Sequence, residues 1–455
     1  MPAQLSLILS TIFTLYLFWA ERRRTPRMSR ALWIPLIWHF LLSTRPVSVW
    51  FNASDAVASP EAYLEGSPVD RAVFLLLILV AVTVLFQRSA SLSRFAGNNA
   101  WLLLFLLYCG ISTLWSDYSF VAFKRWVKEI GNVAMVLIVM TEADPVEAVK
   151  ALFRRLAYVV VPLSIVLIKY FGDLGRQFTH SGEMMFVGVT NHKNSLGILC
   201  AIIVVVFVWH LRHSRKHPVT AWERNDRRIH ILLLMMMAWL MYMANSATST
   251  MCCIVGIGLI YGMELPIMQR NYRRIGTLVV TLLVLGFVLE YAFDLWQVVL
   301  ASLGRDATLT GRTEVWQQVL SIGTDPLFGT GYDSFWLGER VEKFWAMYWW
   351  QPNQAHNGYL ETYLNLGWIG LLLLFGIIFS TYRKIATRMT QQTPYQVLRI
   401  SLYVIALLSN LTEAYFKGLA EIWFMFLLVA IEYPRPAIQP SVNAFTLPRK
   451  EIAWN

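Results

Sequence analysis

The most constraining feature of this chain is a succession of apolar runs, each about 15 to 23 residues long, separated by short polar stretches. A helix that crosses a bilayer needs about 20 apolar residues, because its backbone polar groups must be hydrogen-bonded within the segment. Only 15% of the 455 residues are charged, against about 25% in a soluble globular protein. The sequence therefore predicts an all-α polytopic integral membrane protein and excludes an ordinary soluble enzyme.

Thirteen segments are predicted to span the membrane, several of them short. They are residues 5–20, 31–44, 72–86, 101–115, 127–140, 156–171, 195–211, 229–243, 251–268, 275–293, 357–380, 397–411 and 419–432. We therefore expect about 12 to 13 transmembrane helices.

The charges between the runs predict the orientation. The first run has no basic residue before it and is followed at once by Glu21-Arg22-Arg23-Arg24, which is the reverse of the charge order of a signal peptide. It should stay as an anchor with its N-terminus outside. Alternating the remaining loops places 25 of the 39 Lys and Arg residues inside, as the positive-inside rule expects. The net charge of +11 thus reflects topology, and we expect no nucleic acid partner.

No cofactor or metal site is predicted. The four cysteines, Cys109, Cys200, Cys252 and Cys253, lie in apolar runs without a CxxC motif or a His at metal-ligand spacing, so they are expected to be buried hydrophobic residues. The chain has no HExxH motif, no DxD motif and no adjacent pair of outside carboxylates to hold a divalent metal. The glycine-rich nucleotide-binding motifs are absent as well.

The chain divides into four predicted regions. They are N-terminal transmembrane helices over 1–171, a core over 172–380, C-terminal transmembrane helices over 381–433, and a cytoplasmic tail over 434–455. The core contains two long outside loops, 172–194 and 294–356. The second has a helix-like stretch from Arg312 to Leu320 and a turn-rich centre from Gly323 to Tyr332. It is predicted to be a large extracytoplasmic loop that forms a small subdomain.

Lys and Arg residues in the outside loops call for an explanation, because a charged side chain at a membrane edge costs free energy. The cations of the two long loops are Arg176, Lys193, Arg305, Arg312, Arg340 and Lys343. An anion site is favoured for Arg176, Lys193 and Arg312, since arginine donates two hydrogen bonds to a phosphate at once. For Arg340 and Lys343 solvated charge or contact with lipid headgroups is favoured. Beside Lys193, a plain helix cap by Asn194 or Ser195 stays an alternative.

The best candidate for a catalytic base is His356, which precedes the longest apolar helix at the end of the larger loop. A histidine with its unperturbed pKa of about 6.5 suits general base catalysis near neutral pH. The alternative is a capping or hydrogen-bonded histidine, and His180 and His192 in the other loop compete for the role. The supporting candidates are Asn357, Glu361, Glu413, His192 and Arg305. A carboxylate at a membrane edge can orient a base, bind sugar hydroxyls or be structural.

Five motifs taken in order resemble the signatures of a known family. They are Gly188–Gly197, Asn245–Thr250, Gly311–Trp316, Pro326–Tyr332, and Ala355–Glu361 followed by Gly367 and Gly370. The set resembles the O-antigen ligase and polymerase superfamily. The likeness runs from about Arg176 to about Gly370, extends weakly to Asn410–Glu413, and is specific as a set.

The resemblance implies a function. Members of this superfamily are bacterial inner-membrane glycosyltransferases, which transfer a glycan from an undecaprenyl-diphosphate carrier to a sugar hydroxyl on the periplasmic side. The family's diphosphate-binding residues would fall on Arg176, Lys193 and Arg312, and its loop histidine on His356, in a metal-independent reaction that inverts the anomeric carbon.

The acceptor is lipid A core for a ligase and another carrier-linked repeat unit for a polymerase. The His192-Lys193-Asn194 form of the first motif is more similar to the exopolysaccharide polymerase branch, which includes the succinoglycan polymerase. Membrane lipids and a chain-length regulator are the other expected partners.

The alternative function is that of a flippase or secondary transporter of lipid-linked or anionic sugars. A transporter predicts cations at mid-membrane on broken helices and inverted repeats. Only Lys169 is a candidate deep cation, and no repeat is evident. The two functions differ in whether the polar residues converge on one outside cleft or line a path through the bilayer.

Overall fold

The computed structural model describes residues 2–22, 28–51, 66–178, 182–213, 221–270, 312–348, 351–389 and 393–433. The long helices are α1 (Ala3–Arg22), α5 (Pro68–Gln87), α8 (Ser119–Met140), α9 (Pro145–Tyr170), α11 (Lys193–His213), α12 (Ala221–Ala244) and α19 (Gly358–Arg388). The shorter helices are η1 (Arg30–Leu32), α2 (Trp33–Ser43), α3 (Val47–Trp50), α6 (Leu92–Asn98), α7 (Ala100–Ser112), η2 (Thr113–Trp115), α10 (Gly172–Gly175), α13 (Ala247–Gly262), α14 (Pro266–Arg270), α17 (Arg312–Ser321), α18 (Glu339–Met347), α20 (Thr393–Ser409) and α21 (Glu421–Ala430).

The protein is an all-α, multi-pass membrane protein, as predicted, with one small addition. A two-stranded antiparallel hairpin pairs β1 (Arg176–Phe178) with β2 (Met184–Phe186) in the first long loop. Every predicted span that falls within the described residues coincides with a helix, and the predicted span 275–293 lies outside them.

Not all of these helices are long enough to cross a membrane alone. Six are, by length and composition, or up to seven if α6 and α7, which meet at 106°, form one bent span. α13, α20 and α21 are apolar but shorter, and so is η1 with α2. All ten residues of α21 are buried, and its length of about 15 Å is half of a hydrocarbon core. Such short helices were predicted as spans because a helix surrounded by protein is apolar on all sides, as is a helix surrounded by lipid.

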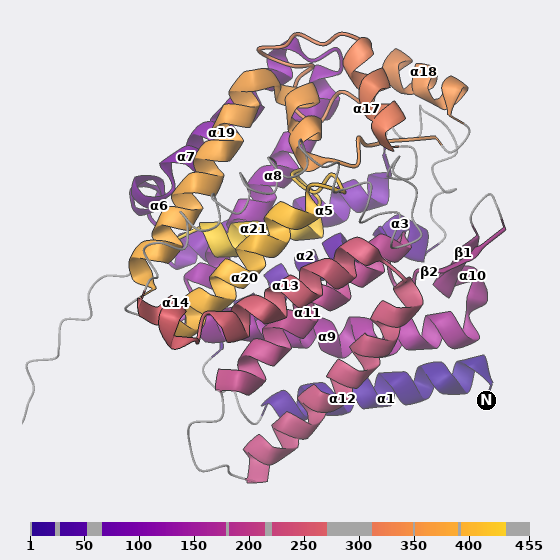
Figure 1. The fold of residues 1–455 in the computed structure, drawn as a ribbon, viewed down its shortest axis with the longest axis vertical. Helices are drawn as coiled ribbons and strands as arrows, with labels where there is room; N and C mark the ends of the chain where they lie inside the picture. The colour runs from indigo at the N-terminus through magenta and orange to yellow at the C-terminus, as the bar shows by residue number, and fades with distance from the viewer. Residues whose placement is uncertain are drawn as a thin grey trace, which may run out of the picture.

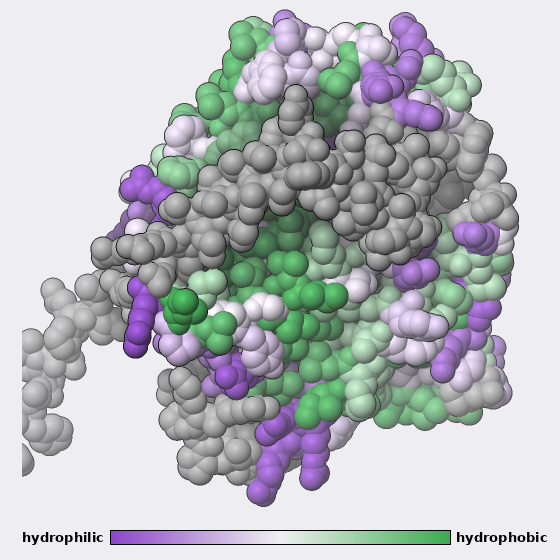
Figure 2. Space-filling model, viewed as in Figure 1, coloured by the Kyte–Doolittle hydropathy of each residue, from purple (hydrophilic) through white to green (hydrophobic). Residues whose placement is uncertain are grey.

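The core lies around α9 and α11. The most apolar stretches of these two helices are 83% and 72% buried. α1 packs along α9, and α7 packs along α19, as Figure 1 shows. α5 packs on α8, yet only 6% of the most apolar stretch of α5 is buried, as expected of a helix that faces lipid. Figure 2 shows hydrophobic residues gathered across the middle of the visible described face and hydrophilic residues at its edges. This pattern is that of a surface embedded in a bilayer.

The two ends of the bundle carry different polar groups. We call the end at which α5, α8, α11 and α19 begin the His356 end. The opposite end collects ion pairs, among them buried Glu21 with Arg154 at 2.8 Å and with Arg155 at 3.0 Å, and Arg399 with Glu432 at 3.0 Å. The pairs formed by Glu21 attach α1 to α9. Each buried charge there has an oppositely charged partner, as a low-dielectric environment requires.

The described part of the larger loop forms a packed subdomain at the His356 end. α17 begins at Arg312, as predicted, and turns follow over 325–337. α17, α18 and the segment before α19 share a small hydrophobic core of their own, made of Val315, Val319, Phe335, Trp336, Val341, Phe344, Ala355 and Leu364.

A kink in α19 joins this subdomain to the membrane helices. Gly367 interrupts α19 with a φ of 63°, in the left-handed region that favours glycine. The amide of Trp368, which the kink frees, donates to the carbonyl of Pro326 at 2.9 Å. A Cβ on Gly367 would lie 2.2 Å from the carbonyl oxygen of Leu327. The turn that begins at Pro326 therefore docks on the kink, and two motifs that are distant in the sequence form one contact.

We predict that Gly367→Ala lowers the thermal unfolding temperature of the purified protein. The substitution adds a left-handed alanine, which costs about 1 to 3 kcal/mol, and a clash with backbone. Gly258→Ala is the matched control, because a Cβ there meets nothing within 4 Å. The control should keep the wild-type unfolding temperature or raise it slightly. Equal stability of both variants would show that the kink is not required.

Candidate functional site

His356 lies in the last residues before α19, in a strained conformation. Its φ is 50°, which is uncommon for a residue other than glycine and is found mainly where surrounding contacts enforce it. The cap of α19 is the next residue, Asn357, whose side chain accepts hydrogen bonds from the amides of Tyr359 and Leu360, both at 3.0 Å. Asn357 therefore has the capping role that was the alternative for His356.

The imidazole of His356 is paired with a carboxylate. His356 Nδ1 lies 2.9 Å from Glu413 Oε2, and the side chains are 23% and 8% exposed. Glu413 belongs to the connection between α20 and α21, and its Oε1 accepts from the side-chain amide of Asn194 at 2.8 Å. With Nδ1 facing a carboxylate, the neutral ring carries its proton on Nδ1 and its lone pair on Nε2. This arrangement suits a general base held in one tautomer.

The segment before His356 is fixed from both sides at Ala355. Its amide donates to Glu361 at 2.8 Å, and its carbonyl accepts from the indole of Trp316 in α17 at 2.7 Å. Glu361 is buried and also accepts from the indole of Trp336 at 3.1 Å. Glu361 therefore positions the loop that carries His356.

The start of α11 contributes Lys193 and Asn194. α11 begins at Lys193, so the alternative of a helix cap at Asn194 or Ser195 does not hold. His192 Nδ1 instead accepts from the amide of Asn194 at 3.2 Å, which leaves the Asn194 side chain to bind Glu413. The His192 side chain thus accepts a backbone amide at the start of α11, and Lys193 is half-buried beside it.

Arg176 lies in the hairpin of the same loop. Its Nε donates to the carbonyl of Ile168 at 2.8 Å, and its guanidinium lies 6.0 Å from the ring of Phe186, its partner in the strand register. Arg45, between α2 and α3, donates to the carbonyls of Leu174 and Gly188. The hairpin is therefore attached to both α9 and the N-terminal helices.

The remaining cations of the two long loops lie in different surroundings. Arg312 is the first residue of α17, one turn before Trp316, while Arg305 and His180 lie outside the described residues. Arg340, expected to meet lipid or solvent, forms an ion pair with Asp117 at 2.7 Å and donates to the carbonyl of Phe335. Lys343 is exposed, as expected.

The sequence analysis missed a group of cations that lie outside the two long loops. A cavity of about 400 Å³ at the His356 end is lined by Arg71, Lys124, Arg125, Lys128 and Lys417, among others. Three of these cations fall within five residues of α8, but only the outside cations of the two long loops were considered for an anion site.

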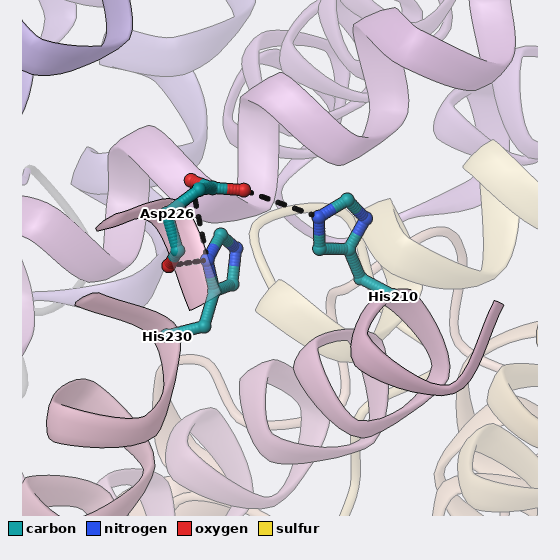
Figure 3. A group of neighbouring side chains, drawn as sticks. All are labelled: His210, Asp226 and His230. Atoms are coloured by element: carbon teal, nitrogen blue, oxygen red, sulfur yellow. Dashed lines mark hydrogen bonds and ion pairs between the residues drawn. The ribbon is translucent and has the colours of Figure 1, made fainter. Parts of the chain in front are cut away.

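A second cluster lies at the opposite end and was not expected from the sequence. Figure 3 shows the Asp226 carboxylate reaching His210, at 3.5 Å, and His230, at 3.4 Å. The three residues offer ligand atoms within 4.8 Å of one another, so they could hold a metal ion. His230 Nδ1 also lies 2.8 Å from the carbonyl of Asp226. Since α11 runs about 25 Å from Lys193 to His210, this cluster is remote from His356.

Comparison with known proteins finds similarity over the part of the chain that includes the His356 loop. Residues 231–375, which include α17 and the His356 loop, match the family model described as O-antigen ligase. This match covers about a third of the chain and supports a place in the O-antigen ligase and polymerase superfamily. The chain is also 27% identical, over 305 residues, to the exopolysaccharide production protein ExoQ of Rhizobium meliloti (strain 1021). The match covers 63% of this chain and 66% of that protein, just under two thirds of its length.

We predict that Glu361→Ala destabilises the protein. The substitution leaves the amide of Ala355 and the indole of Trp336 without their acceptor, at a cost of about 1 to 3 kcal/mol for each buried donor. Glu342→Ala, at an exposed position of α18 in the same subdomain, is the control. The thermal unfolding temperature should fall for the first variant only, and an equal effect in both would contradict the assignment.

Proposed function

We propose that this protein is a glycosyltransferase that transfers a glycan from an undecaprenyl-diphosphate carrier to a sugar hydroxyl of an acceptor. The reaction takes place at the His356 end, which we assign to the periplasmic face of a bacterial inner membrane. The similarity to the superfamily and the distribution of Lys and Arg support this proposal. The observation that carries it is the hydrogen bond between His356 and Glu413 at 2.9 Å.

His356 acts as the general base in the proposed reaction. Its Nε2 accepts the proton of the acceptor hydroxyl as the oxygen attacks the anomeric carbon of the donor sugar. The bond between that carbon and the diphosphate oxygen breaks, and its electron pair leaves with the carrier diphosphate. Glu413 holds the ring and stabilises the imidazolium that forms. Attack from the side opposite to the leaving group inverts the configuration.

The leaving diphosphate gains negative charge, which fixed cations stabilise. We assign this role to Arg176, Lys193 and Arg312, on the basis of the family motifs. Two contacts support the assignment. Lys193 precedes Asn194, which binds Glu413, and Arg312 lies one turn before Trp316, which holds Ala355. Protein cations would therefore do the work that a divalent metal does elsewhere, as the sequence analysis expects.

The acceptor proposed here is a second carrier-linked repeat unit, which makes the protein an exopolysaccharide polymerase. Similarity to a protein named for exopolysaccharide production supports this choice over a ligase that uses lipid A core. A chain-length regulator and membrane lipids stay the predicted partners.

Transport of a lipid-linked sugar is less well supported. His356, Glu413, Asn194 and Gln354 converge at one end of the bundle, which is the arrangement expected of an enzyme. Lys169, the one candidate deep cation of the sequence analysis, is exposed in the last turn of α9, with its ammonium 5.2 Å from the ring of Trp239.

We predict that His356→Ala abolishes polymer formation in a deletion strain. Loss of a general base slows transfer by about 10² to 10⁴-fold, so single repeat units should accumulate on the carrier while long chains disappear. His213→Ala, at the opposite end of α11, should support polymer of wild-type size. The readout is the size distribution of surface polysaccharide and of lipid-linked intermediates, with protein amounts matched by immunoblot.

Two outcomes would contradict this proposal. Full-length polymer made by His356→Ala would rule out the base, and repeat units trapped on the cytoplasmic side in the deletion strain would favour a transporter. Long chains on the carrier beside unmodified lipid A core would point to a ligase.

A further inference from the structure

The cavity beside the His356–Glu413 pair is formed by parts of the chain that lie far apart in the sequence. Its described lining comes from the end of α2, the starts of α5 and α8, Asn191, Asp333 and the connection between α20 and α21. Its volume of about 400 Å³ lies within the range of small-molecule binding sites. Most of its wall therefore belongs to the N-terminal helices, outside the segment that matches the family model.

Positive charge predominates among the described residues that line this cavity. They include five cations, Arg71, Lys124, Arg125, Lys128 and Lys417, and two acids, Asp70 and Asp333, so the excess within this described lining is three positive charges. Both acids have partners within the protein. Asp70 accepts from the amide of Ser48 at 3.0 Å and from its hydroxyl at 2.6 Å, and Asp333 pairs with Arg125 at 3.4 Å.

Two of these cations lie on one face of α8. Lys124 and Lys128 are four residues apart, a spacing that makes side chains neighbours on a helix surface. The ammonium of Lys128 lies 5.6 Å from the ring of Phe74 in α5, which holds it at the cavity wall. An anionic group would be attracted to this wall.

The cavity is connected to the candidate base through one side chain. Lys417 Nζ donates to Gln354 Oε1 at 3.4 Å, and Gln354 Nε2 lies 3.4 Å from His356 Nδ1. Lys417 of the cavity wall and His356 are thus separated by a single side chain.

We propose that this cavity binds a phosphate or carboxylate group carried by the acceptor, and so presents the acceptor hydroxyl to His356. The inference rests on the proposed function, because a transferase binds two substrates. The donor diphosphate is assigned to Arg176, Lys193 and Arg312, and neither Arg176 nor Lys193 is among the described lining residues. The second anion site therefore serves the second substrate. The anion is either the carrier diphosphate of a lipid-linked acceptor or an acidic sugar within it.

The test is protection of lysines from an amine-reactive reagent in the full-length protein reconstituted in lipid nanodiscs. Labelling is measured residue by residue by mass spectrometry, with inorganic diphosphate, D-glucuronate or neutral glucose as the probe. We expect an anionic probe to slow the labelling of Lys124 and Lys417 about tenfold at ten times its dissociation constant, with Lys343 unaffected as the internal control. Protection by diphosphate alone identifies the carrier group, and protection by glucuronate identifies an acidic sugar.

Variants provide the second measurement. Lys124→Gln with Lys128→Gln should raise the KM for the acceptor about 10- to 100-fold, which corresponds to one or two lost charged hydrogen bonds. The KM for the donor should stay near the wild-type value. The double Lys→Arg variant should restore most of the affinity. Arg94→Gln with Arg383→Gln removes the same charge at exposed positions and should change neither KM.

Equal labelling with and without both anions, or an unchanged acceptor KM, would overturn this inference. The labelling experiment involves no transfer reaction. If His356→Ala still makes polymer, the proposed function fails while the anion site is judged separately by protection.

Discussion

The hydrogen bond between His356 and Glu413 is the interaction on which the site depends, because it joins three separate parts of the fold. His356 precedes α19, Glu413 follows α20, and Asn194, which binds the other oxygen of Glu413, lies in the first turn of α11. The pairing therefore requires α11, α19 and α20 to pack with their ends in register. α20 contacts both α11 and α19.

The backbone around this pair is specified by equally close contacts. Gly358 donates its amide to the carbonyl of Asn410 at 2.8 Å, and a Cβ on Gly358 would lie 1.9 Å from Asn410 Oδ1. Asn410 Oδ1 in turn accepts from the amides of Tyr415 and Phe416, both at 2.9 Å. The segment that carries Glu413 is thus folded around one asparagine and docked on the start of α19. This contact explains why Asn-Gly in one motif and Asn410–Glu413 in another accompany the histidine.

The sequence predicted the helices, since these depend on local composition, while His356 as the base stays a prediction that rests on its position within a motif. Glu413 was a candidate among several, because no sequence pattern pairs residues 57 positions apart. Arg340 was assigned to solvent or lipid headgroups because its partner, Asp117, lies in a different loop. The short helices, α21 above all, were read as full spans because hydropathy does not distinguish burial in protein from burial in lipid. The cavity cations were missed because the sequence analysis considered outside cations in the two long loops alone, and no sequence pattern shows that cations of separate short connections line one cavity.

The most direct test of the account is a double-mutant cycle on the transfer rate of the purified protein, reconstituted in vesicles with carrier-linked repeat units. The rates are compared for wild type, Glu413→Gln, His356→Ala and the double variant. If Glu413 acts only by holding His356, the double variant should be no slower than His356→Ala alone, within about threefold, because residues that act as a unit are not additive. Losses that multiply would contradict the account, since Glu413 would then contribute to transfer independently of the histidine.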